Sequence, residues 1–430
     1  MRLLHLADLH IGKQLNGFSL LNDQKFALEG ILRTAEREGV DVLVLSGDLY
    51  DRAAPASDAV ALLDWFLTAA ASQGLAVVAV PGNHDSAERV GYASRLLARQ
   101  NVHVPRQFDG TLEHVEIPDE HGSVTFWLMP FLRPAQVRPF FPDAEIGGDY
   151  TAALRAVIEA APVDPAKRNV LVAHQFVTSG GAEPERSDSE LTIGGVDNVD
   201  ASVFEAFDYV ALGHIHRAQR IGRDAVRYAG SLLKYSTSEA DNRKTAALVE
   251  LGAKPLSEQA GTVSGEAAAN SEDDGAGVCG EADESRGEAG ADGSLPSWIT
   301  VKLVPIEPLH DLREIRGPVA ALTDPATVGA ADAEDYVHAT VTDAQPPLDV
   351  IRMLRAAYPN LIALDFDSAS AQADAGSASP EADAAPDRLD PEALFAQFFE
   401  RQNGRPLSDE QAEATADALA RAQQAEGGVA

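Results

Sequence analysis

The sequence predicts an α/β protein, and three observations lead to that expectation. Short continuous apolar runs, such as Val42–Leu45 and Ala76–Val80, alternate with stretches of helical spacing. Uninterrupted apolar runs indicate strands buried on both faces, and their alternation with helices indicates a largely parallel sheet covered on both sides. A separate strand–helix–strand pattern after residue 298 indicates a small second domain of the α+β type.

The elements follow one another regularly through the first half of the chain. Strands are expected at Arg2–Ala7, Val42–Leu45, Ala76–Val80, Val124–Met129, Val170–Ala173, Tyr209–Leu212, Val226–Ala229 and Ala246–Leu251. Apolar residues at helical spacing predict helices over Asp23–Glu38, Ser57–Gln73, Glu88–Arg99 and Thr151–Ala160. Asn22 or Asp23 is expected to cap the first of these helices, because both side chains accept hydrogen bonds from free backbone amides.

The second half contains two stretches of unusual composition. Ser257–Ser294 has ten acidic and one basic residue among its 38 residues, and no Leu, Ile or aromatic side chain. Such a stretch cannot form a core, so we expect it to be disordered. Ser368–Pro386, rich in Ala, Ser and Asp, is expected to be a linker. Between them, strands are expected at Trp298–Val304, Tyr336–Val341 and Leu361–Leu364, and a helix at Val350–Ala357.

The tail from Pro391 to Ala425 has apolar residues that suit helices. Leu394, Phe395, Phe398 and Phe399 are followed by an Ala-rich helical pattern from Ser408. Aromatic residues beyond a linker are typical of an element that docks on another protein. Packing of the same helix on its own chain is the alternative, and the sequence favours neither.

Charge and composition limit the class of protein. The formal net charge of −33 is the opposite of the basic character usual in nucleic-acid binders, but the acidic residues are unevenly distributed. Cys279 is the single cysteine, which excludes an intramolecular disulfide and a thiolate metal site. The sequence has neither a signal-peptide pattern at its beginning nor an apolar run long enough to span a bilayer. We therefore expect a soluble cytoplasmic protein.

Polar side chains suited to binding metals follow five of the expected strands. They are Asp8 and His10, Asp48, Asn83 and His84, His174, and His214 and His216. Five of the 11 histidines lie in these positions. Because functional groups in parallel sheets gather at the carboxyl ends of the strands, we expect these side chains to meet in one cleft.

This set of ligands favours two hard-to-borderline divalent cations such as Mn²⁺. Two ions about 3.5–4 Å apart stabilise the attacking and leaving oxygens of a phosphoester. Asp48 is expected to bridge them. Asp8, His10 and His216 would complete one site, and Asn83, His174 and His214 the other. His84 remains free to protonate a leaving oxygen, with Asp85 expected to orient its ring.

Each residue taken alone has a more ordinary interpretation. Asp8 or Asp48 could be a helix N-cap after a strand, and His174 could be a structural histidine. His214 and His216 are a better pair, because a spacing of two places both on the same face of an extended segment. The coincidence of all five strand ends is what favours a site. The remaining histidines lie in ordinary contexts, and the acidic run is expected to be solvated.

The series Asp8-x-His10, Gly47-Asp48, Gly82–Asp85, His174 and Gly213-His214-x-His216 resembles the calcineurin-like metallophosphoesterase superfamily. Within it, the stretches Leu4–Lys13, Tyr209–Gln219 and Arg227–Ser236 resemble the SbcD family of bacterial nuclease subunits. The resemblance is strong over about Met1–Leu251 and looser over Trp298–Leu364, which is similar to the DNA-capping domain of that family. The acidic insert, the linker and the net charge depart from the family pattern.

The resemblance implies a β-sandwich core flanked by helices, a small capping domain and C-terminal helices. The implied domains are a nuclease domain at 1–256, an acidic insert at 257–297, a capping domain at 298–367, a linker at 368–390 and partner-binding helices at 391–430. It further implies a double-strand exonuclease (3′–5′) and single-strand endonuclease that depends on Mn²⁺, with Mg²⁺ as the alternative. It would process DNA ends and hairpins in repair, recombination and replication.

The implied assembly is a homodimer within a heterotetramer that contains an SbcC-like ATPase. The sequence has no glycine-rich phosphate loop with Lys-Ser/Thr, so any ATPase must be a partner. Two other functions stay open: another phosphoesterase of the superfamily, acting on a small phosphodiester or a phosphoprotein, and an inactive scaffold. The intact ligand positions argue against the scaffold.

Overall fold

The computed structural model describes residues 1–190, 197–255, 294–343, 346–347 and 349–367, together with Gln411 and Thr415. It divides into two compact units, Met1–Ser368 and Ala369–Ala430. The predictions for the acidic insert up to residue 293, for the linker and, apart from Gln411 and Thr415, for the C-terminal helices lie outside the described residues. Among the residues that are described, no helix combines the length and apolar character that crossing a membrane requires.

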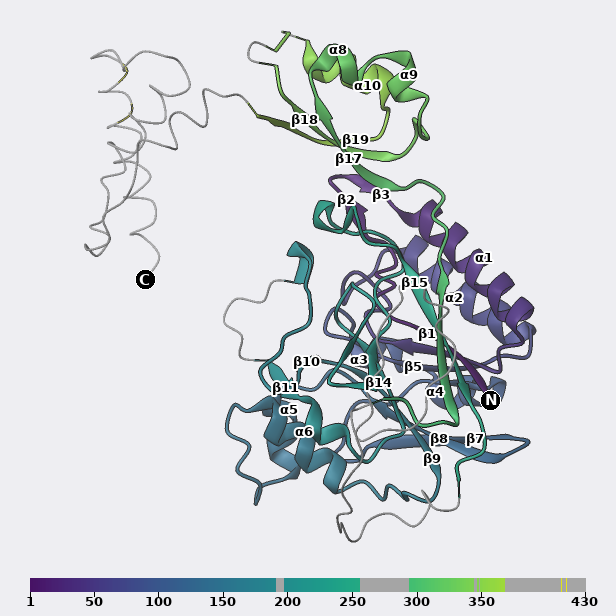
Figure 1. Ribbon diagram of the computed structural model, residues 1–430. Helices are drawn as coiled ribbons and strands as arrows, with labels where there is room; N and C mark the ends of the chain where they lie inside the picture. Colours follow the sequence, from purple (N-terminus) through teal and green to yellow (C-terminus); the bar gives the residue numbers. More distant parts are fainter. Residues whose placement is uncertain are drawn as a thin grey trace, which may run out of the picture. The chain divides into compact units, whose positions relative to one another are not determined.

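Two six-stranded sheets form the core of the first unit (Figure 1). The order in the first is β16 (Ile299–Pro305), β15 (Thr245–Leu251), β1 (Arg2–Leu6), β4 (Val42–Ser46), β5 (Ala76–Val80) and β6 (Val102–His103). The order in the second is β13 (Gln219–Ile221), β14 (Arg223–Tyr228), β12 (Tyr209–Gly213), β9 (Arg168–His174), β8 (Gly122–Met129) and β7 (Glu113–Asp119). Strands β1, β4, β5 and β6 are parallel, as are β8, β9, β12 and β14.

The apolar strands have a different partner on each face. Val42 and Val44 of β4 pack in a core with Val170 and Val172 of β9, between the two sheets. The alternate residues of β4 belong to a second core, which includes α1 (Leu21–Glu38) and α2 (Ser57–Ser72). A third core joins the second sheet to α6 (Tyr150–Glu159). The predicted α/β fold with a β-sandwich flanked by helices is thus confirmed, whereas one sheet with helices on both faces is wrong.

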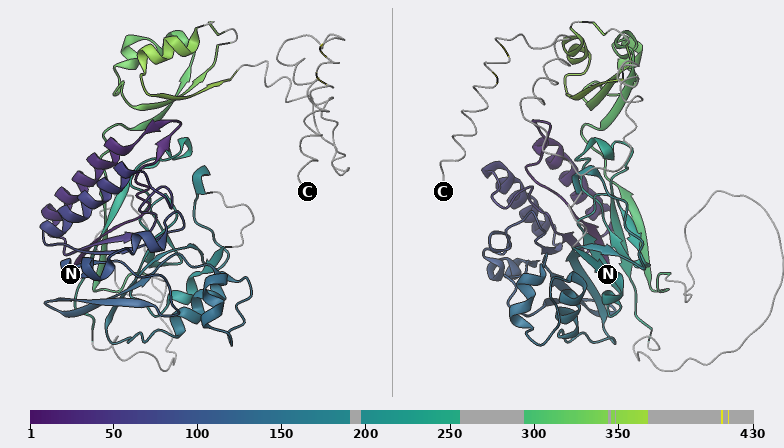
Figure 2. Two further views of the ribbon diagram at one scale, coloured as in Figure 1. Left: turned by 180° about the vertical axis from the view of Figure 1, so that it is seen from behind. Right: turned by 90° about the vertical axis from the view of Figure 1, so that its left-hand side faces the viewer.

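The helices α1 and α2 lie side by side, as Figures 1 and 2 show. Leu20 occupies the N-cap position of α1 and no side chain caps this helix, so the predicted cap is wrong. Asp23 instead accepts hydrogen bonds from His310 Nδ1 at 2.9 Å and from the Tyr336 hydroxyl at 3.0 Å. This carboxylate links the first helix to the second half of the chain.

The helix predicted over Glu88–Arg99 is broken into short pieces. They are α3 (Ala87–Val90), α4 (Ser94–Leu97) and the 3₁₀ turn η1 (Ala98–Gln100). Ala93 has a φ of 58°, in the left-handed region that a continuous helix does not allow. Three further short helical segments, α5 (Pro134–Val137), η2 (Arg138–Phe140) and η4 (Ala201–Phe204), lie in loops. The pairs β2 (Gln14–Leu15) with β3 (Phe18–Ser19) and β10 (Phe176–Thr178) with β11 (Asn198–Asp200) are small ribbons.

A three-stranded parallel sheet with helices on one face follows (Figures 1 and 2). Its strands are β17 (Leu312–Gly317), β18 (Tyr336–Val341) and β19 (Leu361–Phe366), and its helices are α8 (Val319–Leu322), α9 (Pro325–Val328) and α10 (Val350–Ala357). Strand β16 lies within the stretch expected to form the capping domain, but it pairs with β15 and completes the first sheet of the core. The domain boundaries stay predictions.

Asp119, the last residue of β7, forms an ion pair that joins β7 to β9 at the edge of the second sheet. Its carboxylate binds the Arg168 guanidinium through two hydrogen bonds, of 2.9 and 2.5 Å. Partial burial raises the pKa of Asp119. The Arg168 guanidinium, the N-terminal ammonium at 2.9 Å and the His121 amide together outweigh burial and hold the pKa below its ordinary value. This pair therefore stabilises the fold above the unfolded-state pKa of about 4, and the contribution is lost as the pH falls further.

We expect Asp119→Asn to lower the free energy of unfolding at pH 7 by about 2–4 kcal/mol, between the ranges for exposed and buried pairs. Urea titrations from pH 7 to pH 2 should show that the difference from the unmodified protein shrinks below pH 4. The matched control is Glu116→Gln on the same strand, which breaks the exposed pair with Lys167 and should leave the midpoint unaltered. An equal loss at pH 7 and pH 2 would contradict the role of the Asp119 charge.

Candidate dinuclear metal centre

The predicted ligands come from strand ends of both sheets. Asp8 follows β1 and Asp48 follows β4, whereas His174 is the last residue of β9. His214 follows β12, and β12 pairs with β9 so that Gly213 lies opposite His174. The carboxyl ends of the parallel strands in the two sheets therefore meet at one end of the sandwich, the usual place for functional groups in parallel sheets.

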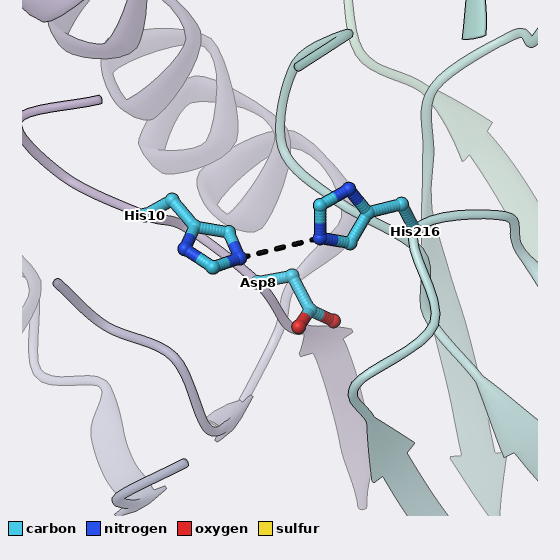
Figure 3. Close-up of side chains that lie close together, drawn as sticks. All are labelled: Asp8, His10 and His216. Carbon is cyan, nitrogen blue, oxygen red and sulfur yellow. Dashed lines mark hydrogen bonds between the residues drawn. The ribbon is translucent and has the colours of Figure 1, made fainter. Parts of the chain in front are cut away.

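One group of side chains consists of Asp8, His10 and His216, and all three are buried. Their ligand atoms lie within 4.8 Å of one another. Figure 3 shows the Asp8 carboxylate beside the two rings, with His10 Nε2 and His216 Nε2 3.2 Å apart. Three donor atoms of the types that borderline cations prefer thus face one small volume.

The second group is built around Asp48 and His174. Asp48 Oδ2 lies 3.2 Å from His174 Nε2 and 3.7 Å from His10 Nε2, so this carboxylate touches both groups. The Asn83 side-chain oxygen lies 3.0 Å from His174 Nε2 and 3.0 Å from His214 Nδ1. The structure thus brings all seven predicted ligands together. Both carboxylates lie between the two groups, because a ligand atom of Asp8 is also within 4.8 Å of those of Asp48 and His174. That these side chains bind metal remains a prediction.

The backbone at the site is strained. Asp8, His10, Asp48 and His214 have φ values of 50°, 43°, 48° and 101°. Residues with side chains rarely adopt positive φ, and they do so mainly where the surrounding structure requires a particular side-chain direction. The alternative interpretation of Asp8 and Asp48 as helix N-caps is wrong, because α1 and α2 begin after Leu20 and Ala56.

Two glycines allow strand ends to approach the ligands closely. A side chain at Gly82 would overlap the Asp48 carboxylate, which accepts a hydrogen bond of 2.8 Å from the His84 amide. A side chain at Gly213 would overlap the Ser46 carbonyl, the same oxygen that orients His174. Because both contacts involve backbone or ligand atoms, only glycine fits at either position.

The hydrogen bonds around the histidines show which nitrogens face the site. His174 Nδ1 donates to the Ser46 carbonyl at 2.8 Å, and His216 Nδ1 donates to the Glu239 carboxylate at 3.0 Å. Each ring is therefore held with its Nε2 atom directed at the centre. His10 Nδ1 is buried and has no hydrogen-bond partner among the described residues. Carboxylate oxygens, an amide oxygen and imidazole nitrogens converge there, and such a set of atoms fits divalent cations once the rings are neutral.

The electrostatics of the cluster lead to the same conclusion. Burial raises the pKa of Asp8 to about 6. Burial would also raise the pKa of Asp48, but the field of His174, its hydrogen bond to Asp48 and the fields of His10 and His84 together outweigh burial and hold this pKa well below its ordinary value. Burial lowers the pKa of His174, yet Asp48 more than compensates and raises it to about 9. A proton on His174 thus supplies positive charge that a cation would otherwise provide.

His84 differs from the seven buried or half-buried ligands in being exposed. Its Nδ1 lies 3.0 Å from the Asp51 carbonyl, and its ring packs edge-on against His10 at 4.9 Å between centroids. Because the carbonyl can only accept, Nδ1 carries a proton and Nε2 is available to a substrate. The expectation that Asp85 orients this ring is wrong. Its carboxylate accepts hydrogen bonds from backbone amides, at 3.0 Å from Leu49 and at 2.9 Å from both Tyr50 and Gly82.

The sequence did not indicate three buried charged residues beside His216. Glu239 binds its ring, Glu190 accepts a hydrogen bond from its backbone amide, and Lys244 binds its carbonyl at 2.9 Å. These residues lie in loops without apolar periodicity, and a charged residue in such a loop ordinarily faces solvent. No local pattern distinguishes them from the other charged residues of the chain.

Comparison with known proteins places this geometry in a family. A family model described as calcineurin-like phosphoesterase matches residues 1–218, half of the chain. The chain therefore belongs to the calcineurin-like phosphoesterase family, as its motifs predicted. A second model, described as the Type 5 capsule protein repressor C-terminal domain, matches residues 308–403.

The chain is similar to the SbcD subunit of the nuclease SbcCD from Staphylococcus epidermidis. The two are 29% identical over 367 residues, which cover 85% of this chain and 85% of that protein. The resemblance to the SbcD family is thereby confirmed. Among solved structures, a dimetal phosphatase from Danio rerio matches with a TM-score of 0.36 and 13% identity, over 58% of this chain and 92% of that one.

Removal of Asp48 tests the arrangement of the metal centre. Because this carboxylate touches both groups, we expect Asp48→Ala to abolish binding of both cations. Crystals grown with Mn²⁺ should show two anomalous-scattering peaks in the unmodified protein and none in the variant. Asp64→Ala, at an exposed position of α2, is the control and should retain both peaks. Two peaks in Asp48→Ala would contradict the bridging role.

Proposed function

We propose that the chain is a Mn²⁺-dependent DNA nuclease subunit that cleaves phosphodiester bonds at DNA ends and hairpins. The proposed activities are 3′–5′ exonuclease action on double strands and endonuclease action on single strands, in repair, recombination and replication. The observation that carries the proposal is the convergence of seven ligand-type side chains beside the exposed His84, in a chain similar to an SbcCD nuclease subunit over most of its length.

The chemistry required is the hydrolysis of a phosphodiester. Two divalent cations held by the seven ligands would stabilise the negative charge of the phosphoryl group and lower the pKa of a water. The protein itself holds the ligands rigidly: backbone hydrogen bonds join Asp8 to Gly47 at 3.1 Å and His10 to Asp48 at 2.9 Å. Such preorganised groups need little rearrangement during the reaction.

His84 supplies the proton that the leaving group needs. As the bond between phosphorus and the leaving oxygen breaks, that oxygen takes the proton from Nε2 of the His84 imidazolium. The hydrogen bond from Nδ1 to the Asp51 carbonyl holds the ring in place for this transfer. The Asp51 carboxylate is itself held by Lys13 at 3.1 Å, so the loop that carries this carbonyl is fixed to the segment that follows β1.

The proposed assembly is a homodimer bound to an SbcC-like ATPase in the cytoplasm. The similarity to a subunit of the SbcCD nuclease supports this proposal, as does a sequence that lacks a phosphate-binding glycine loop. Digestion of end-labelled duplex DNA with Mn²⁺, with and without that partner, tests the function. Cleavage of a cyclic nucleotide without any action on linear duplex DNA would favour a different phosphoesterase.

We expect His84→Ala to reduce DNA cleavage by at least about 10²-fold, because general acid catalysis is typically worth that much. Metal binding should persist, since the buried ligands are untouched, and calorimetry with Mn²⁺ checks this. The matched control is His121→Ala, which changes a histidine in the turn between β7 and β8 and should leave the rate unaltered. An unchanged rate in His84→Ala would refute the role of its ring.

Deletion of Ser257–Ser294 tests the effect of the acidic insert. The stretch contributes nine net negative charges, which repel the phosphate backbone. We expect the deletion to strengthen DNA binding or to leave it unchanged, as measured by fluorescence anisotropy over a series of salt concentrations. Weaker binding after the deletion would show that the insert participates in binding.

A further inference from the structure

His216 is held from behind by a buried carboxylate. Its Nδ1 lies 3.0 Å from Glu239 Oε1, and Glu239 is completely buried at the end of the 3₁₀ turn η5 (Thr237–Glu239). The other ring nitrogen, Nε2, faces His10 across 3.2 Å. Since an ionised carboxylate can only accept a hydrogen bond, Glu239 places the ring proton on Nδ1 and leaves the Nε2 lone pair directed at the metal centre.

Glu239 is in turn held by Lys244. The Lys244 ammonium donates to Glu239 Oε2 at 2.6 Å, to the Ser231 hydroxyl at 2.8 Å and to the His216 carbonyl at 2.9 Å. The same lysine thus binds both the carboxylate that orients the His216 ring and the backbone of His216 itself. The His216 side chain, Glu239, Lys244 and the His216 carbonyl are thus joined in one closed hydrogen-bond network. A movement of the His216 side chain or backbone would break at least one of these hydrogen bonds.

Burial of this ion pair suggests a positioning role. Lys244 is 9% exposed and Glu239 is fully buried, so both charges are largely removed from water. Buried ion pairs contribute little net stability compared with apolar residues of the same volume. Glu190 also lies near the ring, but its carboxylate is 3.7 Å from His216 Nδ1 and binds the His216 and Ser187 amides instead. Glu239, and not Glu190, therefore accepts the hydrogen bond from Nδ1 of the ring.

The two halves of the metal centre differ in how their histidines are oriented. His174 donates its Nδ1 proton to a neutral backbone carbonyl, that of Ser46, at 2.8 Å. His216 donates to a charged carboxylate, a stronger acceptor that makes the ring a better ligand. The histidine with a charged acceptor, His216, thus lies beside Asp8 and His10. The histidine with a neutral acceptor, His174, lies beside Asn83.

We propose that Glu239, held by Lys244, is a positioning residue that directs His216 Nε2 at one of the two cation positions and sets the affinity of that position alone. The inference rests on the proposed function only in requiring that the chain bind two divalent cations. It assigns to the loop before β15 a role in metal binding that no ligand motif includes.

Calorimetric titration of the full chain with Mn²⁺ tests the inference without any measurement of activity. The unmodified protein should show two binding events. Glu239→Gln preserves the shape of the side chain, but its amide has one oxygen where two donors, His216 Nδ1 and the Lys244 ammonium, each need an acceptor. In this variant one binding event should weaken by about 10–100-fold and the other should stay unchanged. The matched control Glu250→Gln removes an exposed carboxylate on β15 and should change neither event.

Lys244→Met should weaken the same event, because Glu239 then loses its partner and its hold on the ring. The matched control is Lys167→Met, which breaks an exposed ion pair with Glu116 and should change neither event. Circular dichroism establishes that each variant is folded. Ser231→Ala removes a neutral hydroxyl that accepts from Lys244 at 2.8 Å and lies 3.4 Å from Glu239 Oε2. It provides a milder variant if the charge substitutions do not fold, with a few-fold weakening of the same event expected.

The outcomes separate this inference from the proposed function. Two unchanged binding events in folded Glu239→Gln or Ser231→Ala, or equal weakening of both events, would overturn the positioning role while leaving a dinuclear nuclease intact. Failure of the unmodified chain to bind Mn²⁺ would instead remove the proposed function, and the inference with it. Selective loss of one event, with the controls unaffected, supports the inference.

Discussion

The structure depends on holding carboxylates and imidazole rings close together at the buried end of a β-sandwich. Asp8 and Asp48 are almost completely inaccessible to solvent, and the groups that face them are amides and histidine rings. Buried negative charge is costly unless positive charge compensates for it. Without a cation, a proton on His174 provides part of that compensation, and two divalent cations would provide the rest. The site therefore needs more positive charge than the polypeptide itself supplies, and divalent cations would provide it.

The rest of the sandwich maintains this unfavourable arrangement. Apolar strands on both sides of the interface fix the strand ends, and positive φ angles at Asp8 and Asp48 persist because both neighbouring sheets constrain them. Gly82 and Gly213 allow the backbone to approach the ligands where a side chain would not fit. Strain and close approach are thus concentrated at the place where the chemistry occurs.

Contacts from other parts of the chain complete the centre. Lys244 binds the His216 carbonyl through its side chain, and its own carbonyl accepts a hydrogen bond from the Ile306 amide at 2.9 Å. Ile306 directly follows β16, and Asp23 binds His310 a few residues later. The chain that leads to the three-stranded sheet is therefore attached to the residues that support His216. A carboxylate predicted to cap a helix serves this attachment instead.

The sequence alone determined the class of fold, the position of most strands and helices, and the set of side chains at the strand ends. These features depend on local patterns, namely the periodicity of apolar residues and the polar residues that follow an apolar run. It did not distinguish one sheet flanked by helices from two sheets packed together, since a continuous apolar run looks the same whether helix or sheet covers it. Only the tertiary structure decided that Asp51 rather than Asp85 fixes His84, and that Glu239 and Lys244 support His216. Some of those contacts join residues that are distant in the chain, and others depend on the conformation of a loop. A local pattern of residues encodes neither a long-range contact nor a loop conformation.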